Sequence, residues 1–231
     1  MSARQLATCA VMTALLIAVQ FVLGYVPGVE LVTVFFLSFC VSYGIRCGLI
    51  TATAFSLVRC IIWGFYPAVV LLYLIYYNLF ALLFGALKKR NVPVWLCPVL
   101  FLLLGIASAY FAVSGVPVSI LYEKRLTVML WILFGICMAL MLLYFVLLAV
   151  KRGTWGREIA SYTALAAFCT VLFTLLDDVI SPLVAGWSYE ATLAYFYTSF
   201  LTMLPQTICA AASVFFLYLP LKRVFSATYR S

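Results

Sequence analysis

Long apolar runs separated by short breaks constrain this chain more than any other feature. Only 9% of its 231 residues are charged, too few to cover the exterior of a soluble protein of this length. About 20 helical residues cross the ~30 Å hydrocarbon core of a bilayer, and several of the runs reach that length. The runs lie at about residues 6–26, 30–45, 48–65, 67–87, 94–114, 127–150, 159–178 and 193–219. We therefore predict an all-α polytopic membrane protein with about eight transmembrane helices, the first run being a span and not a signal peptide.

Helix-breaking and charged residues mark the boundaries between these runs. They are Pro27-Gly28, Gly44 to Gly48, Pro67, Lys88 to Pro93, Gly115 to Pro117, Lys151 to Gly156 and Ser181 to Gly186. The second and third runs are short, and the sequence GIRCG at residues 44–48 joins them. We expect these two runs to form a tilted pair of helices with a tight turn between them.

Basic residues fall almost entirely on one side of the predicted membrane. With the N-terminus inside, the inner loops hold 11 of the 14 basic residues: Arg4, Arg46, Lys88, Lys89, Arg90, Lys151, Arg152, Arg157, Lys222, Arg223 and Arg230. The positive-inside rule therefore predicts that both ends of the chain are cytoplasmic. The cations are scattered over short loops and form no dense patch, so the net charge of +8 does not indicate nucleic-acid binding.

Five of the six acidic residues lie on the predicted outer side. They are Glu30, Glu123, Asp177, Asp178 and Glu190, whereas Glu158 lies inside. Because acidic residues contribute little to topology, this bias needs another cause. A carboxylate at the membrane boundary is either solvated or lines a wet cavity, and within the membrane it is a functional candidate.

The sequence offers no recognisable catalytic or metal-binding motif. It has no histidine, which removes the commonest general base and the commonest metal ligand. Its eight cysteines form no CxxC pair and lie in or beside apolar runs, as small buried hydrophobic residues do. The chain also has no P-loop and no catalytic triad. We expect no enzymatic activity of its own, no catalytic residue, no bound metal and no cofactor.

Four stretches of the chain occur in an order and spacing that resemble one family of membrane proteins. They are RQLATCAVMTALLIAVQFVLGYVP, VPGVELVTVFFLSFCVSYGIRCGLITATAFSLVRCIIWGFYP, YLIYYNLFALLFGALKKRN and YFYTSFLTMLPQTICAAASVFFLYLPLKRVF. Together they cover a little over half of the chain. The chain resembles the substrate-binding S component of energy-coupling factor (ECF) importers, which are ABC transporters for vitamins and other micronutrients.

The resemblance implies a single transmembrane domain with a six-helix core, and this chain departs from it by having eight predicted spans. We expect the first four core helices within residues 1–93 and the last two within 151–231. Residues 94–150 would form an inserted helical hairpin. Because both ends of this hairpin would face inside, the insertion leaves the orientation of the core unchanged.

The resemblance also implies a location and partners. An S component in a bacterial cell membrane captures a small vitamin-like solute outside. It delivers the solute through a T-type transmembrane subunit that works with two cytoplasmic ABC ATPases. Small residues of the first helix, which repeat at helical spacing, would dock on the T subunit: Ala7, Ala10, Ala14 and Ala18. The alternative for this face is close helix packing within the chain alone.

Aromatic and amide residues on two spans predict a substrate site. Tyr73 and Tyr77 share one face of the fourth span, and Asn78 lies beside them. An aromatic face with a few fixed polar groups suits a small-molecule pocket. The alternative is an aromatic belt at the membrane interface with an interhelical hydrogen bond. On the last span, Tyr195 and Gln206 share a face, and both ligand contact and interhelical bonding stay open for them.

We expect residues 177–190, which contain Asp177 and Trp187, to form an outer loop. The resemblance makes this segment part of a lid over the substrate, with hinges at Pro182 and Gly186. The alternative is a solvated connector in which Trp187 anchors the chain at the membrane interface.

Two charged residues near the outer surface each have more than one interpretation. Arg59, with Trp63 one turn away, has three interpretations: it pairs with an acid, it snorkels outward, or it binds a ligand carboxylate. Glu30 follows Pro27-Gly28 at the start of the second span, where the helix dipole favours a carboxylate. Glu30 is therefore either a helix-start acid or an acceptor for hydrogen bonds from the substrate.

Two other classes of function stay open at the level of sequence. A metal-dependent membrane enzyme would use Asp177 and Asp178 to hold a divalent ion, although no second acidic motif accompanies them. A small secondary transporter would carry an inverted internal repeat, which we do not find. The charge and identity of the substrate also stay open, since a flat heterocycle and a large corrinoid-like ring system fit an aromatic pocket equally well.

Overall fold

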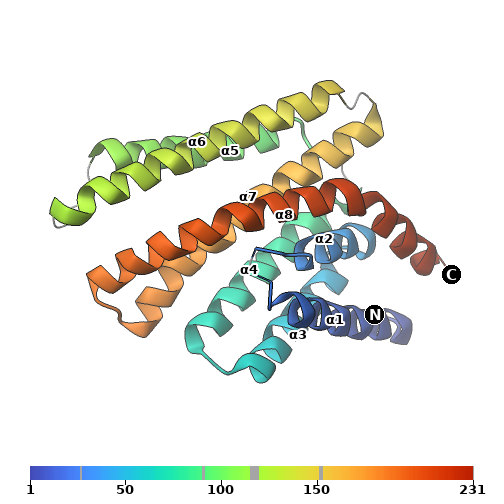
Figure 1. The fold of residues 1–231 in the computed structure, drawn as a ribbon. Helices are drawn as coiled ribbons and strands as arrows, with labels where there is room; N and C mark the ends of the chain where they lie inside the picture. The colour runs from blue at the N-terminus through green and yellow to red at the C-terminus, as the bar shows by residue number, and fades with distance from the viewer. Residues whose placement is uncertain (27, 90–91, 115–119, 151–152, 231) are drawn as a thin grey trace.

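The computed structural model describes residues 1–26, 28–89, 92–114, 120–150 and 153–230. The expected breaks at Pro27, Arg90, Gly115 to Pro117 and Lys151-Arg152 lie outside these residues. The described chain is all helical, without strands (Figure 1). Its elements are α1 (Ala3–Leu23), α2 (Val32–Tyr43), α3 (Ile45–Trp63), α4 (Pro67–Ala86), the 3-10 turn η1 (Leu87–Lys89), α5 (Leu96–Ser114), α6 (Ile120–Val150), α7 (Thr154–Ala185) and α8 (Tyr189–Arg230).

Seven of the helices in these ranges are long and apolar enough to span a membrane, and α2 is a shorter apolar helix. The prediction of an all-α polytopic membrane protein with about eight membrane helices is therefore confirmed. Most helices are apolar around their whole circumference, since one side packs inside the protein and the other faces lipid.

The short helix α2 lies at the centre of the bundle. Ten of its 12 residues are buried, and it packs against α1, α3, α4 and α8. Twelve residues rise about 18 Å, so α2 alone is too short to cross the bilayer. Gly44, with φ +87°, ends α2 and begins α3, which is the tight turn predicted between the second and third spans. A positive φ of this size is readily adopted only by glycine.

The predicted hairpin at residues 94–150 is present as α5 and α6. These two helices pack side by side and then against α7, at one edge of the molecule (Figure 1). The Tyr144 hydroxyl of α6 donates to the Val94 carbonyl oxygen over 2.9 Å, which fixes the end of α6 to the start of α5. The hairpin thus extends the bundle sideways and leaves the arrangement of α1 to α4 around α2 intact.

The prediction that residues 177–190 form a loop is wrong. Helix α7 continues to Ala185 and α8 begins at Tyr189, so only a short turn separates them. Gly186 ends α7 in the left-handed conformation, with φ +63°. Asp177 and Asp178 lie within α7, where Ser181 and Tyr195 donate hydrogen bonds to the Asp177 carboxylate. Pro182, the expected hinge, lies within α7.

One end of the bundle gathers several basic residues. A depression there is lined by the N-terminus, by Arg46 in the first turn of α3, and by Lys88 after α4. At the same end, Lys222 of α8 forms an ion pair with Glu158 of α7, and Tyr218 donates to the same carboxylate over 2.6 Å. Both chain ends point toward this side (Figure 1). The described residues thus reproduce the one-sided clustering of cations that the sequence predicts.

Candidate ligand-binding cavity

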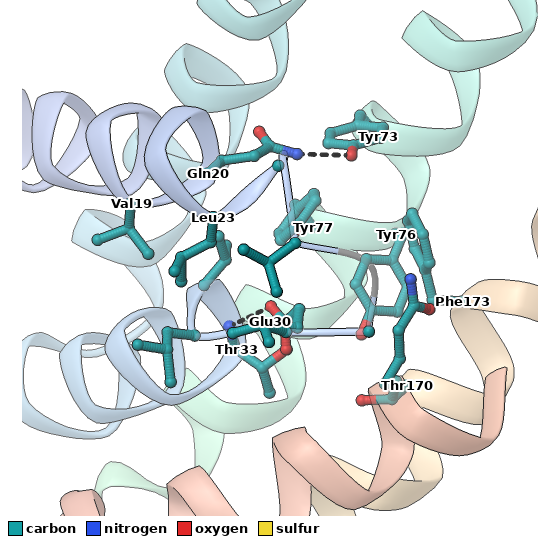
Figure 2. A pocket seen from close by; sticks show the side chains of 17 residues that line it. Val19, Gln20, Leu23, Glu30, Thr33, Tyr73, Tyr76, Tyr77, Thr170 and Phe173 are labelled. Carbon is teal, nitrogen blue, oxygen red and sulfur yellow. Dashed lines mark hydrogen bonds between the residues drawn. The ribbon is translucent and has the colours of Figure 1, made fainter. Parts of the chain in front are cut away.

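A cavity of about 230 Å³ reaches from the middle of the bundle, at Phe173 and Gln206, to the C-terminal end of α1, whose N-terminus lies at the basic end. Its wall is assembled from five helices and from the connection between α1 and α2 (Figure 2). Residues that line it include Gln20 of α1, Glu30 of the connection, Thr33 of α2, Tyr73, Tyr76 and Tyr77 of α4, Thr170 and Phe173 of α7, and Gln206 of α8. A concave site where several elements converge, with few polar groups on an aromatic wall, is the usual form of a small-molecule pocket.

Glu30 uses its two carboxylate oxygens differently. Its Oε1 accepts a hydrogen bond from the backbone N–H of Thr33 over 2.7 Å and so caps the start of α2. Its Oε2 is buried and has no hydrogen-bond partner among the described residues. Burial raises the pKa of the Glu30 carboxyl, whereas the hydrogen bonds from Thr33 oppose this rise. The hydrogen bond to Thr33 shows the helix-start role of Glu30, and its role as an acceptor for the substrate stays a prediction.

Four aromatic rings form one wall of the cavity. The rings of Tyr76 and Phe173 meet at 4.7 Å between centroids, and Tyr77 contacts Tyr76 at 5.1 Å. Tyr73 lies 5.2 Å from Tyr77 and 5.7 Å from Phe173. The rings meet edge to face or tilted, which is the favourable geometry for aromatic pairs. This wall joins α4 to α7 and presents flat apolar surface to a ligand.

Gln20 connects the cavity to Arg59. The Gln20 side-chain amide donates to the Tyr73 hydroxyl over 2.9 Å, while Gln20 Oε1 is buried without a hydrogen-bond partner in the described chain (Figure 2). The Arg59 guanidinium carbon lies 4.1 Å from the Tyr73 ring centroid, a cation–π contact, and Arg59 Nε is buried without a hydrogen-bond partner in the described chain. Arg59 does not line the cavity itself but contacts the ring of Tyr73, which does.

The connection between α1 and α2 is held against α8. Gly28 has φ +82°, and a Cβ atom at this position would lie 2.8 Å from Cβ of Pro205. One turn along α8, Cys209 Sγ accepts from the Glu30 N–H over 3.3 Å. Glycine is thus required at position 28 both for its backbone conformation and for its close approach to Pro205. These contacts close one side of the cavity and position Glu30.

A second polar cluster joins α7 to α8 close to their connecting turn. Asp177 accepts hydrogen bonds from Ser181 over 2.5 Å and from Tyr195 over 2.7 Å, and the ring of Trp187 contacts Tyr195 at 5.1 Å. Asp178 is buried, and its Oδ1 has no hydrogen-bond partner in the described chain. In this cluster the Asp177 carboxylate is engaged by two protein hydroxyls.

The predicted substrate residues therefore fall into three places. Glu30, Tyr73, Tyr77 and Gln206 line the cavity. Asp177, Trp187 and Tyr195 belong to the cluster between α7 and α8.

The remaining three face the α1 and α3 side of the molecule. Arg59 contacts the ring of Tyr73, and Trp63 contacts Phe21 of α1 at 5.9 Å. Asn78 accepts from Thr53 of α3 over 3.1 Å and donates to the Leu74 carbonyl of its own helix, so it makes the interhelical bond that was its alternative interpretation.

Several residues that line the cavity were not predicted from the sequence. Gln20 carries an amide within an apolar span, and the cost of burying an unpaired amide should have marked it as it marked Gln206. Tyr76 lies beside the predicted aromatic face and has no separate signal. Thr170 and Phe173 of α7 are residue types that occur throughout membrane helices, so nothing in the sequence singles them out.

The alanine face of α1 points outward. Ala7, Ala10, Ala14 and Ala18 are all exposed. The last three line an open apolar groove of about 810 Å³ between α1 and α3, together with Ala54, Ile50 and Val58 of α3. Larger side chains, such as Leu6, Phe21 and Val22, flank the alanines. The groove is therefore a shallow channel floored by small residues on the membrane-facing surface.

These features define a multi-pass helical membrane protein with a partly open cavity lined by polar and aromatic residues. No known protein family, curated protein or solved structure matches the chain.

Proposed function

We propose that this protein is the substrate-binding S component of an ECF-type importer in a bacterial cell membrane. It would capture a small vitamin-like solute in the cavity beside Glu30. A T-type transmembrane subunit and two cytoplasmic ABC ATPases would then drive delivery of the solute into the cell. The four sequence stretches that resemble this family are the reason for proposing this class of protein.

The observation that carries the proposal is the exposure of the α1 alanines. Small residues at helical spacing in membrane helices normally mark the place where another helix approaches closely. Ala10, Ala14 and Ala18 floor an open groove, so no helix of the described chain covers this face. The groove has the form expected for a surface that receives a helix of the T subunit.

The cavity supports the binding half of the proposal. It is a partly open cavity between five helices and one connection, and it reaches the C-terminal end of α1, whose N-terminus belongs to the basic end of the bundle. If that cluster is cytoplasmic, as the positive-inside rule requires, the cavity is on the side from which an importer takes its solute. Capture outside and energy coupling inside then use opposite ends of the same bundle.

Affinity purification of the tagged chain from its native membrane in mild detergent tests this function. Mass spectrometry of the eluate should find a polytopic T-type subunit and two ABC ATPases in near-stoichiometric amounts. Recovery of the chain alone, before and after chemical crosslinking, would contradict the proposal. A variant with a leucine on an unrelated exposed surface, Ala107→Leu on α5, should purify with the same partners as the unchanged chain. It controls for general effects of an added leucine on solubilisation.

A further inference from the structure

The cavity contains two buried hydrogen-bond acceptors that the described protein leaves without donors. They are Oε2 of Glu30 and Oε1 of Gln20, and both residues line the same cavity. An unpaired buried polar atom is destabilising, and a charged one is more so. Their second atoms are already committed, Glu30 Oε1 to Thr33 and the Gln20 amide nitrogen to Tyr73. A ligand that donates hydrogen bonds would satisfy both acceptors.

The charge of the cavity wall favours the same class of ligand. Glu30 is the only carboxylate among the described lining residues, and no lysine or arginine lines the cavity with it. An anionic ligand would therefore place its charge beside Glu30, while the cation in contact with the wall, Arg59, faces the ring of Tyr73 and does not line the cavity. A ligand with amino groups or a protonated ring nitrogen would instead pair with Glu30 by a charge-assisted hydrogen bond.

The shape of the cavity limits the rest of the ligand. Tyr76, Tyr77 and Phe173 offer flat aromatic surface, on which planar rings stack and cations bind favourably. An engineered protein cavity of about 150 Å³ holds one benzene molecule. The volume of about 230 Å³ is thus enough for one ring or two small fused rings with short substituents. A large corrinoid-like ring system, which the sequence alone left open, could enter this volume only in part.

We propose that the cavity binds a compact, flat nitrogen heterocycle whose N–H groups donate to Glu30 and Gln20. This inference deepens the proposed function and rests on it for the biological role of binding. Its chemistry depends only on the cavity, so the two can fail separately. The donors would be exocyclic amino groups or protonated ring nitrogens, and the ring would lie against the Tyr76 and Phe173 side of the wall.

Calorimetry on the purified full-length protein with two matched probes tests the ligand class. 2-Aminobenzimidazole is a fused bicycle rich in N–H donors, and 2-methylbenzoxazole has a similar size and shape but no N–H group. We expect 2-aminobenzimidazole to bind more tightly, and Glu30→Gln to weaken it roughly tenfold to hundredfold, as loss of a hydrogen bond to a charged group does. Glu190→Gln should leave binding unchanged, because Glu190 is exposed in the first turn of α8 and lies outside the cavity.

Three results would overturn the ligand class: equal affinity for the two probes, a preference that survives in Glu30→Gln, or no binding of either probe. None of these results would remove the T subunit and ATPases from the affinity purification, so they would leave the importer proposal standing. Conversely, donor-dependent binding by a chain that is purified without partners would uphold the site and contradict the importer.

Discussion

The backbone N–H of Glu30 donates to Sγ of Cys209 over 3.3 Å, and that thiol donates back to the Glu30 carbonyl oxygen over 3.5 Å. The two residues are 179 positions apart in the chain. This reciprocal contact fastens the connection between α1 and α2 to the middle of α8. It explains why Glu30, which belongs to no helix, has a fixed place in the cavity wall.

The first prediction concerns the same connection. Gly28→Ala places a methyl group 2.8 Å from Cβ of Pro205 and forces a positive φ on alanine, which costs on the order of 1–3 kcal/mol. We expect the connection to move away from α8 and 2-aminobenzimidazole binding to weaken about tenfold. Calorimetry provides the measurement. Gly153→Ala is the matched control, since Gly153 also has a positive φ, +113°, but has open space around it. Equal weakening in both variants would contradict the role of the Gly28–Pro205 contact.

The second prediction concerns the packing of α4 against α3. A Cβ atom on Gly85 would lie 2.7 Å from both N and Cα of Ile45, a backbone that cannot move aside easily. Gly85→Ala should therefore lower stability by roughly 1–3 kcal/mol, the usual cost of overpacking. Gly135→Ala in α6 meets nothing within 4 Å and should be neutral or slightly stabilising. Thermal unfolding in detergent, followed by tryptophan fluorescence, compares the two, and equal melting temperatures would refute the close approach.

The third prediction concerns the groove. Ala14→Leu adds three carbon atoms to its floor, so a partner helix could no longer approach closely. We expect the amount of co-purified T subunit to fall at least several-fold while the stability of the chain and probe binding stay unchanged. Ala107→Leu makes the same change on the exposed surface of α5 and should have no effect. Undiminished co-purification of the Ala14 variant would mean that the partner docks elsewhere.

The fourth prediction concerns pH. Because burial raises the pKa of Glu30 in the folded state, the folded protein holds its proton more tightly than the unfolded chain does. The resulting contribution to stability is complete below the unfolded-state pKa and is lost as the pH rises through the raised folded-state pKa. The melting temperature should therefore fall as the pH rises through this range. Glu30→Gln should remove this fall, whereas Glu190→Gln should retain it. An unchanged pH profile in Glu30→Gln would show that another group causes the dependence.

Much of this fold follows from the periodicity and length of apolar runs. The turn at Gly44 and the hairpin of α5 and α6 could be predicted because glycine, proline and basic residues mark their ends. The end of α7 could not. We expected the span to end near residue 178 and a break at Ser181 to Gly186, but α7 continues to Ala185, and Tyr195 of α8 donates a hydrogen bond to Asp177 within it. A single sequence does not reveal which long-range partner a buried charge finds.

The site was partly predictable for a similar reason. Tyr77 and Asn78 are adjacent in sequence, but successive residues of a helix point about 100° apart. Tyr77 therefore lines the cavity while Asn78 faces Thr53 of α3. Sequence could identify α4 as an aromatic helix with an amide, yet the choice between its two faces depends on where α3 and α7 pack.

Photo-crosslinking at Ala14 in the native membrane tests the central claim most directly. A benzophenone-bearing amino acid at position 14 would lie on the floor of the groove, and the same residue at position 107 would face outward from α5. Our account predicts that irradiation links position 14, but not position 107, to a T-type transmembrane subunit identified by mass spectrometry. Crosslinks at position 14 to lipid alone, indistinguishable from those at position 107, would contradict the assignment of this protein as an S component.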